Sequence, residues 1–285
     1  MKSANRILIP LFLITLLALV PSRAGAHIFD LVARDYVSFP TMMSDLENVR
    51  LVFIGELHDH PGHHLAQLQV IRALHEAGIP LAIGLEMFRA EYQFVLDNWV
   101  KGVLPERQFL TYYRNNWSLW PLYRDIFFYA RKNAIPMVGL NISREITRKV
   151  ASSGFESLSK RQRRGLPMVR CDVDERYQAY MRRVLGKHVH GGAKFLNFCE
   201  AQMVWDVTMA NHLLTYLKSH PQKTVVVLAG SGHAWKFGIP EQIRRQEDIP
   251  CRVLLPEIPG RIELDSATAK AGDYLLLGTG VGPLH

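Results

Sequence analysis

An unbroken apolar run at residues 224–229 (TVVVLA), closed by Gly230, restricts the fold of this 285-residue chain more than any other feature. A strand with apolar side chains on both faces needs a cover on both faces, which is typical of a parallel sheet between layers of helices. Shorter runs of the same character, each readable as a buried strand, lie at residues 50–54, 81–85, 136–140, 252–255 and 274–277. Helical patterns separate most of these runs. The alternation predicts an α/β fold with a mostly parallel sheet flanked by helices.

Two segments have helical rather than strand character and are predicted as helical additions to the sheet, at about residues 89–133 and 155–195. Asn197 and Glu200 resemble a capping box and predict the start of a long helix reaching about residue 218. Ser143 is predicted to cap a shorter helix. No Pro/Gly/Ser-rich linker divides the chain, so residues 27–285 are predicted to form a single domain.

The first 26 residues have the pattern of a secretory signal peptide. Lys2 and Arg6 precede an apolar run at residues 7–20, and the small tripeptide 24–26 follows, so we expect cleavage before His27. That run is shorter than the roughly 20 residues that a membrane-spanning helix needs. We therefore expect a periplasmic or secreted protein. Membrane association stays open, although no cysteine follows the run to accept a lipid.

The basic balance of the chain first suggests a nucleic-acid partner. The formal charge of +8 falls to +5 when Lys2, Arg6 and Arg23 leave with the signal peptide. Much of the remaining excess lies in the basic run at residues 160–164, which lacks apolar periodicity and is typical of a solvated helix or loop. Because the protein is also predicted to be exported, we expect no nucleic-acid partner.

The three cysteines allow at most one disulfide within a monomer. In an oxidising compartment a pair such as Cys171 and Cys199 is permitted. Buried free thiols fit the sequence equally well.

Chemically capable side chains follow three of the predicted strands. Glu56 and His58 come after the first, Glu86 after the second, and His233 after the glycine-rich turn that closes residues 224–229. Ligands of α/β sheets sit beyond the carboxyl ends of the strands, so these side chains are expected to converge. Imidazole and carboxylate groups bind zinc, manganese and iron, and they also perform acid–base chemistry.

Four strings resemble one known family: IGELHDHPGHH, GLEMF, NFCEAQMVWDVTMANHL and VVVLAGSGHAWKFGIP. They are similar to the ChaN family of bacterial haem-binding, iron-regulated proteins. That family shares a superfamily with the Tiki metalloproteases, the TraB/PrgY proteins and the erythromycin esterases. The resemblance runs from about residue 40 to the last predicted strand, and its long Glu-Ala-Gln string is more specific than either Gly-x-x-His element.

The resemblance implies an exported haem-binding protein of haem or iron uptake, which forms a homodimer around two haems and uses a tyrosine of the helical insertion. Tyr177 and Tyr180, one helical turn apart, are the candidate haem ligands, because a phenolate can bind haem iron. Simple packing of both tyrosines is the alternative. The basic side chains that can meet the haem propionates are Arg176, Arg182, Arg183 and Lys187.

The superfamily also implies a rival function, a metal-dependent hydrolase of the protease or esterase kind. The candidate catalytic residues, which would also ligate a divalent metal, are Glu56, His58, Glu86 and His233. A metal-free version has His58 as the base and Glu86 as the group that orients it. The predicted supports of the same pocket are His63, His64, Gln202 and Asp206.

Overall fold

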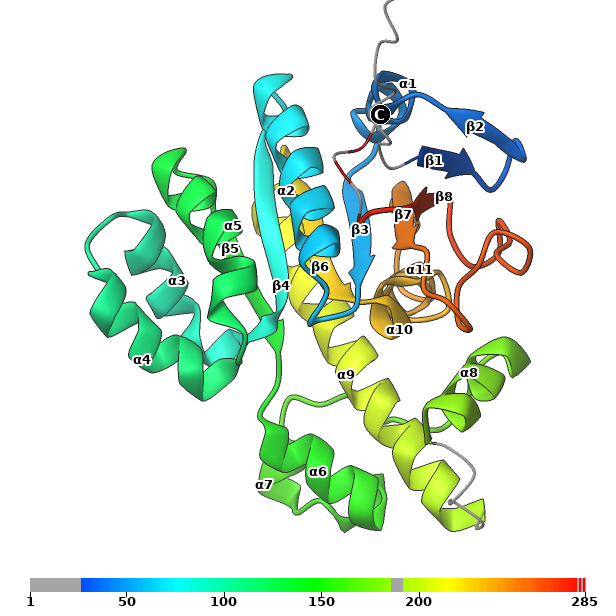
Figure 1. The fold of residues 1–285 in the computed structure, drawn as a ribbon. Coiled ribbons are helices and arrows are strands. Elements are labelled where there is room, and N and C mark those ends of the chain that lie inside the picture. The colour runs from blue at the N-terminus through cyan, green and yellow to red at the C-terminus, as the bar shows by residue number, and fades with distance from the viewer. Residues whose placement is uncertain (1–26, 186–191, 281, 283, 285) are drawn as a thin grey trace, which may run out of the picture.

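The computed structural model describes residues 27–280 except 186–191, together with residues 282 and 284. The predicted signal peptide and Lys187 lie outside the described residues. In the described part, one eight-stranded sheet has the order β2-β1-β8-β7-β3-β6-β4-β5 (Figure 1). The strands are β1 (His27–Asp30), β2 (Asp35–Val37), β3 (Leu51–Glu56), β4 (Leu81–Arg89), β5 (Met137–Asn141), β6 (Thr224–Gly230), β7 (Cys251–Pro256) and β8 (Tyr274–Leu277).

The six strands from β8 to β5 run parallel, whereas β1 pairs antiparallel with both β8 and β2. These six are the strands that the apolar runs predict, and the predicted α/β class with a mostly parallel sheet is confirmed. The apolar runs do not predict β1 and β2. Both strands are short, and β2 is a largely exposed edge strand, so neither shows an unbroken apolar run.

Helices cover both faces of the sheet (Figure 1). The α-helices are α1 (Phe39–Leu46), α2 (Pro61–Glu76), α3 (Gln93–Val100), α4 (Glu106–Asn116), α5 (Trp120–Lys132), α6 (Arg144–Ser153), α7 (Lys160–Arg163), α8 (Glu175–Leu185), α9 (Gly192–Ser219), α10 (Ser231–Ala234) and α11 (Ile239–Arg244). Two short 3₁₀ helices are η1 (Ala90–Tyr92) and η2 (Phe155–Ser157). The predicted helical segments around 89–133 and 155–195 therefore hold η1 with α3 to α5, and η2 with α7, α8 and the first turn of α9.

Two helix starts were predicted from capping residues, and they differ in outcome. The Ser143 hydroxyl accepts a hydrogen bond from the backbone N–H of Glu145 at 3.3 Å and caps α6 as predicted. The start at Asn197 is wrong, because α9 begins more than a turn earlier, at Gly192. Glu200 instead accepts a hydrogen bond from the backbone N–H of Phe155 at 2.7 Å, which ties η2 to α9.

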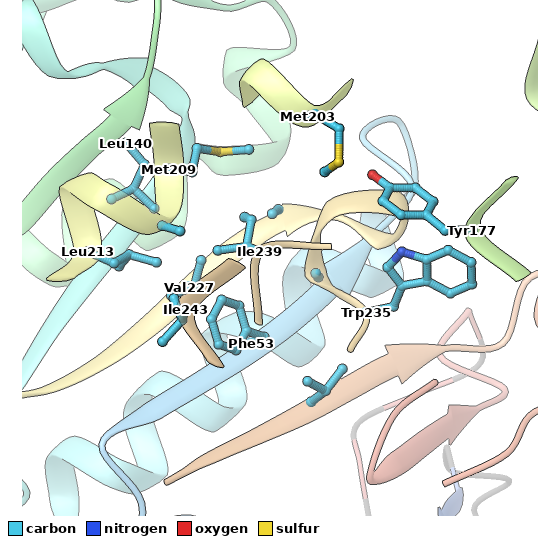
Figure 2. Packing of buried hydrophobic residues seen from close by; sticks show 14 of the residues in the cluster. Phe53, Leu140, Tyr177, Met203, Met209, Leu213, Val227, Trp235, Ile239 and Ile243 are labelled. Atoms are coloured by element: carbon cyan, nitrogen blue, oxygen red, sulfur yellow. The ribbon is translucent and has the colours of Figure 1, made fainter. Parts of the chain in front are cut away.

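The core has two layers because β3 and β6 are buried on both faces. Phe53 and Val227 point to one layer, where α9 and α11 pack (Figure 2). Their chain neighbours Val52 and Val226 point to the other layer, which includes α2 and α5. Side chains alternate across a strand, so each face of the sheet gains a continuous apolar surface. Truncation of Phe53 to alanine is expected to cost about 3–5 kcal/mol of stability.

A disulfide joins Cys171 to Cys199 with a Cα–Cα distance of 5.4 Å, so the pairing that the sequence permits is present. It ties the segment before α8 to α9. Cys251 is a free, partly buried thiol. No helix among the described residues combines the length and apolar character needed to cross a membrane.

Candidate functional site

The carboxyl ends of β3 and β6 lie side by side, and β4 is the next strand. Glu56 is the last residue of β3 and pairs in register with Gly230, the last residue of β6. His233 follows on α10, the short helix that starts directly after β6. Glu86 lies on β4, one residue beyond the pairing of Leu85 with β6. The sheet therefore brings the polar residues of three strands to one edge.

A chain of three hydrogen-bonded side chains begins at the buried Tyr123 on α5 and ends at the partly exposed His58. The Tyr123 hydroxyl donates to Oε1 of Glu56, and the same oxygen accepts from Nδ1 of His58 at 2.7 Å. The other oxygen of Glu56 accepts from the Gln67 amide at 2.6 Å. Burial raises the pKa of Glu56, but hydrogen bonds with His58 and His64 outweigh it and hold that pKa well below its usual range. Glu56 is thus a carboxylate that fixes the His58 ring.

His63 and His64 brace the loop between β3 and α2. Nδ1 of His63 accepts the backbone N–H of Leu57 at 2.9 Å, and burial together with the neighbouring histidines lowers the pKa of His63 to about 4. His64 donates through Nε2 to the carbonyl oxygen of His58 at 2.9 Å and through Nδ1 to Gln67 at 3.2 Å. Both rings are buried and neither lines the cavity described below.

A second hydrogen-bonded chain, again a tyrosine, a carboxylate and a histidine, ends at His233. The Tyr177 hydroxyl on α8 donates to Oδ2 of Asp206 at 2.6 Å, and Oδ1 of Asp206 accepts from Nδ1 of His233 at 2.6 Å. Burial opposes the charged form of His233, but attraction to Asp206 and Glu86 outweighs it and raises the pKa of His233 to about 9. Each of the two imidazoles is therefore held at Nδ1 by a buried carboxylate, with Nε2 left for other contacts.

Glu86 lies next to both imidazoles. Its Oε2 accepts the backbone N–H of Gly230 at 2.7 Å, and its Oε1 lies 4.0 Å from Nε2 of His233. A Cβ atom on Gly230 would come within 3.0 Å of the His58 ring and 3.6 Å of the Glu86 carboxylate. A larger residue at position 230 would therefore press on the His58 ring, which glycine avoids.

A cavity of about 290 Å³ opens at this edge of the sheet. His58, His233 and Gln202 line it, and Tyr180 and Arg261 form part of its wall. The hydroxyl of Tyr180 lies against Gly232, where a Cβ would approach it to 2.5 Å. Burial raises the pKa of Tyr180, and the charges of Arg261 and Arg183 work against that rise.

Tyr177 lies one helical turn from Tyr180 but does not line this cavity. Its side chain is fully buried and packs edge-on against Trp235, with ring centroids 5.3 Å apart (Figure 2). Burial raises the pKa of Tyr177 well above its usual value, so the group is a neutral phenol. Of the two predicted haem ligands, only Tyr180 lines the cavity.

The predicted metal-ligand set is brought together only in part. Both oxygens of Glu56 are occupied by hydrogen bonds from Tyr123, His58 and Gln67. Among the described residues, no group of three or more His, Cys, Asp or Glu side chains is arranged to hold a metal ion. The donors do not fit a metal centre in this conformation. The orienting carboxylate of His58 is Glu56, and the predicted one, Glu86, binds Gly230 instead.

Three further residues of the site were not predicted from the sequence. Tyr123 and Gln67 bind Glu56, and Arg261 lines the cavity. Gln67 lies on the same helical face as His63 and His64, which is the one signal that points to it. Tyr123 is one of many aromatic residues in its segment, and Arg261 lies in a turn without a pattern.

Comparison with known proteins identifies one family and several solved structures of similar fold, two of which bear on this chain. The family model described as haem-binding uptake, Tiki superfamily, ChaN, matches residues 42–243. ChaN of Campylobacter jejuni, solved with cofacial haem binding, is 21% identical over 89% of this chain and 96% of that chain, with a TM-score of 0.70. A mutant of the erythromycin esterase EreC in its open conformation is 14% identical over 87% of this chain and 94% of that chain, with a TM-score of 0.52. No curated protein matches the sequence.

Proposed function

The chain belongs to the haem-binding uptake family of the Tiki superfamily, ChaN, and on that premise we propose that it is an exported protein that binds haem for haem or iron uptake. The signal-peptide pattern of residues 1–26 supports export to the periplasm or the medium. The cofacial haem binding of the similar Campylobacter protein supports a homodimer in which two haems face each other.

The observation that carries the proposal is the position of Tyr180. Its ring lines the cavity and is only partly buried, whereas Tyr177 is enclosed and donates to Asp206. A phenolate is an axial ligand for haem iron. Burial raises the pKa of Tyr180, and the cations of Arg261 and Arg183 offset part of that rise. A whole haem is larger than the 290 Å³ cavity, so Tyr180 would hold it from the mouth of the cavity.

The haem propionates are assigned to Arg261 and Arg183. Arg261 lines the cavity, and both cations act on Tyr180. Two of the arginines predicted for this role are engaged elsewhere. The guanidinium of Arg182 stacks 3.9 Å from the ring centre of Phe195, and that of Arg176 lies 5.9 Å from the ring centre of Phe237. A guanidinium fork matches the two oxygens of a propionate.

A haem titration of the purified protein tests the function. The proposal expects a Soret band that saturates at one haem per chain, together with a doubling of mass in solution on haem addition. Myoglobin treated to remove its haem serves as the positive control for the haem stock. A linear rise without saturation, the behaviour of haem adsorbed without a site, contradicts the function.

A second candidate, hydrolysis of an ester without a metal, is favoured by the two matching chains Tyr123–Glu56–His58 and Tyr177–Asp206–His233. A carboxylate that holds Nδ1 of a histidine leaves Nε2 to take a proton from water, which is the arrangement of a general base. His58 is the base in this candidate, because its ring lines the cavity and is the more exposed of the two. Ester cleavage by the EreC neighbour supports the choice of substrate class.

The rate of p-nitrophenol release from p-nitrophenyl acetate measures this esterase activity. His58→Asn is expected to lower the rate by about 10²-fold or more, the usual range for a general base. His75→Asn is the matched control, because His75 contacts Tyr129 away from the cavity. Equal rates for the wild type and His58→Asn rule the candidate out and leave the haem proposal untouched.

A further inference from the structure

A second cavity, of about 460 Å³, lies at the β5 edge of the sheet. Its walls come from β5, from η1 and α3, and from the carboxyl-terminal half of α9. Its volume falls in the range of roughly 300–1,000 Å³ that small-molecule sites occupy. None of its lining residues belongs to the Glu56–His233 site.

One wall is a row of three side chains, two on α9 and the third on the residue that directly follows it. His212, Tyr216 and His220 are four residues apart and so share a helical face. Nδ1 of His212 donates to the carbonyl oxygen of Leu140 at 2.7 Å, and Nδ1 of His220 donates to that of Tyr216 at 3.0 Å. A carbonyl oxygen only accepts, so the tautomer with its proton on Nδ1 fits this geometry and leaves Nε2 as an acceptor. The Tyr216 and His220 rings stack with centroids 4.1 Å apart.

The opposite wall is the edge strand, and Gln93 occupies its hydrogen-bonding groups. The Gln93 amide donates to the carbonyl oxygen of Met137 at 2.7 Å and accepts the backbone N–H of Gly139 at 2.9 Å. It also donates to Oδ1 of Asp97 at 2.9 Å. Gln93 thus already binds two backbone groups of this edge, which opposes the addition of a strand there, so the cavity suits a small molecule better than an extended peptide.

The charge of the lining identifies the kind of molecule. Asp97 is the single carboxylate, and neither lysine nor arginine lines the cavity, although the chain as a whole carries +8. Burial raises the pKa of the Tyr216 hydroxyl, and the negative charge of the nearby Asp97 carboxylate raises it further. Among the described residues the Tyr216 hydroxyl is buried without a hydrogen-bond partner. Acceptors, one negative charge and an aromatic ring therefore meet in one place.

We propose that this cavity binds a small organic monocation, an ammonium group on an apolar body. The ammonium meets the Asp97 carboxylate and an imidazole Nε2, because all of these accept hydrogen bonds. The apolar body packs against the Tyr216 ring and the stretch of β5 that lines the cavity. An aromatic face also attracts the cation directly. The site is independent of the proposed haem function.

Calorimetric titration with phenethylammonium tests the proposal, with 2-phenylethanol as the neutral isostere and 3-phenylpropionate as the anion. We expect saturable binding of one phenethylammonium per chain, at least about tenfold weaker binding of the alcohol, and no binding of the anion. Equal binding of the three probes, or no saturable binding of the cation, overturns the proposal.

Two variants test whether Asp97 is the source of the preference for the cation. Asp97→Asn retains the carbonyl oxygen that binds Gln93 but removes the charge, and it is expected to abolish the preference for the cation over the alcohol. Asp125→Asn is the control, because Asp125 is exposed on α5 away from the cavity. Because Asp97 is at the surface, Asp97→Asn is expected to fold. A far-UV circular dichroism spectrum identical to that of the wild type would show that it does. A preference that survives Asp97→Asn, or that is lost in Asp125→Asn, contradicts the assignment.

Discussion

Nδ1 of His233 lies 2.6 Å from Oδ1 of Asp206, a carboxylate that is fully enclosed on α9. The same relation holds on the other side of Glu86, where Nδ1 of His58 lies 2.7 Å from Glu56. Each carboxylate also receives a tyrosine hydroxyl. Two buried tyrosines thus bind the carboxylates that hold two histidines at the carboxyl ends of β3 and β6. Supporting hydrogen bonds of this kind orient the functional side chains of a site.

The ion pair with Asp206 predicts an unusual titration of His233. Its pKa in the folded protein is about 9, against 6.5 for an unperturbed histidine. Protonated His233 therefore stabilises the fold fully below about pH 6.5, and this contribution is lost as the pH rises through about 9. NMR titration of the His233 ring is expected to show this midpoint, and Asp206→Asn to lower it. A midpoint near 6.5 in the wild type contradicts the ion pair.

Gly232 is expected to control the position of Tyr180. A Cβ at this position would lie 2.5 Å from the Tyr180 hydroxyl, so Gly232→Ala must push the phenol away or lose stability. We expect a cost of about 1–3 kcal/mol in urea unfolding, as for other overpacked sites, together with weaker haem binding. Gly192→Ala is the control, because a Cβ there meets nothing within 4 Å. Haem affinity unchanged in Gly232→Ala argues against a role for Tyr180.

The Cys171–Cys199 disulfide is expected to hold α8, the helix that carries Tyr177 and Tyr180. Cross-linking residues 28 apart in sequence is expected to contribute about 3–4 kcal/mol of stability by restricting the unfolded chain. Urea unfolding with and without dithiothreitol measures it. Cys251→Ser, which leaves the disulfide intact, separates this effect from the free thiol. If the unfolding midpoint is the same in both conditions, the disulfide does not stabilise the fold.

Arg261 is expected to recognise the negative charge of a haem propionate. The wild type should bind haem more tightly than haem dimethyl ester, whose propionates are neutral, and Arg261→Gln should lose about tenfold in haem affinity with little change for the ester. Arg182→Gln is the matched control, because Arg182 stacks on Phe195. A loss of affinity for both ligands in Arg261→Gln would indicate a structural role instead.

The sheet could be predicted from the sequence where burial on both faces leaves an unbroken apolar run, as in β3 and β6. The same reasoning places Glu56, Glu86 and His233 at one edge, because parallel strands bring their carboxyl ends together. It fails for β1, which pairs with β8 far away in the sequence, and for β2, which pairs with β1. Strand pairing over such a distance leaves no local signal in a half-exposed strand.

The partners of the site were harder to predict. Tyr123 reaches Glu56 only because α5 packs on the sheet, and the two residues are 67 positions apart. Tyr177 and Tyr180 have the same local pattern, so the sequence treats them alike, whereas helix α8 turns one into the core and the other to the cavity. Contacts of this kind are set by tertiary packing, which a local pattern does not encode.

The most direct test of the central claim is an absorbance titration of haem into the wild type, Tyr180→Phe and Tyr177→Phe. The wild type and Tyr177→Phe are expected to give a saturating Soret band at one haem per chain, because Tyr177 serves only Asp206. Tyr180→Phe is expected to lose that band, because a phenyl ring has no oxygen for the iron. A wild type without a saturating band, or a Tyr180→Phe protein that binds haem like the wild type, contradicts the claim.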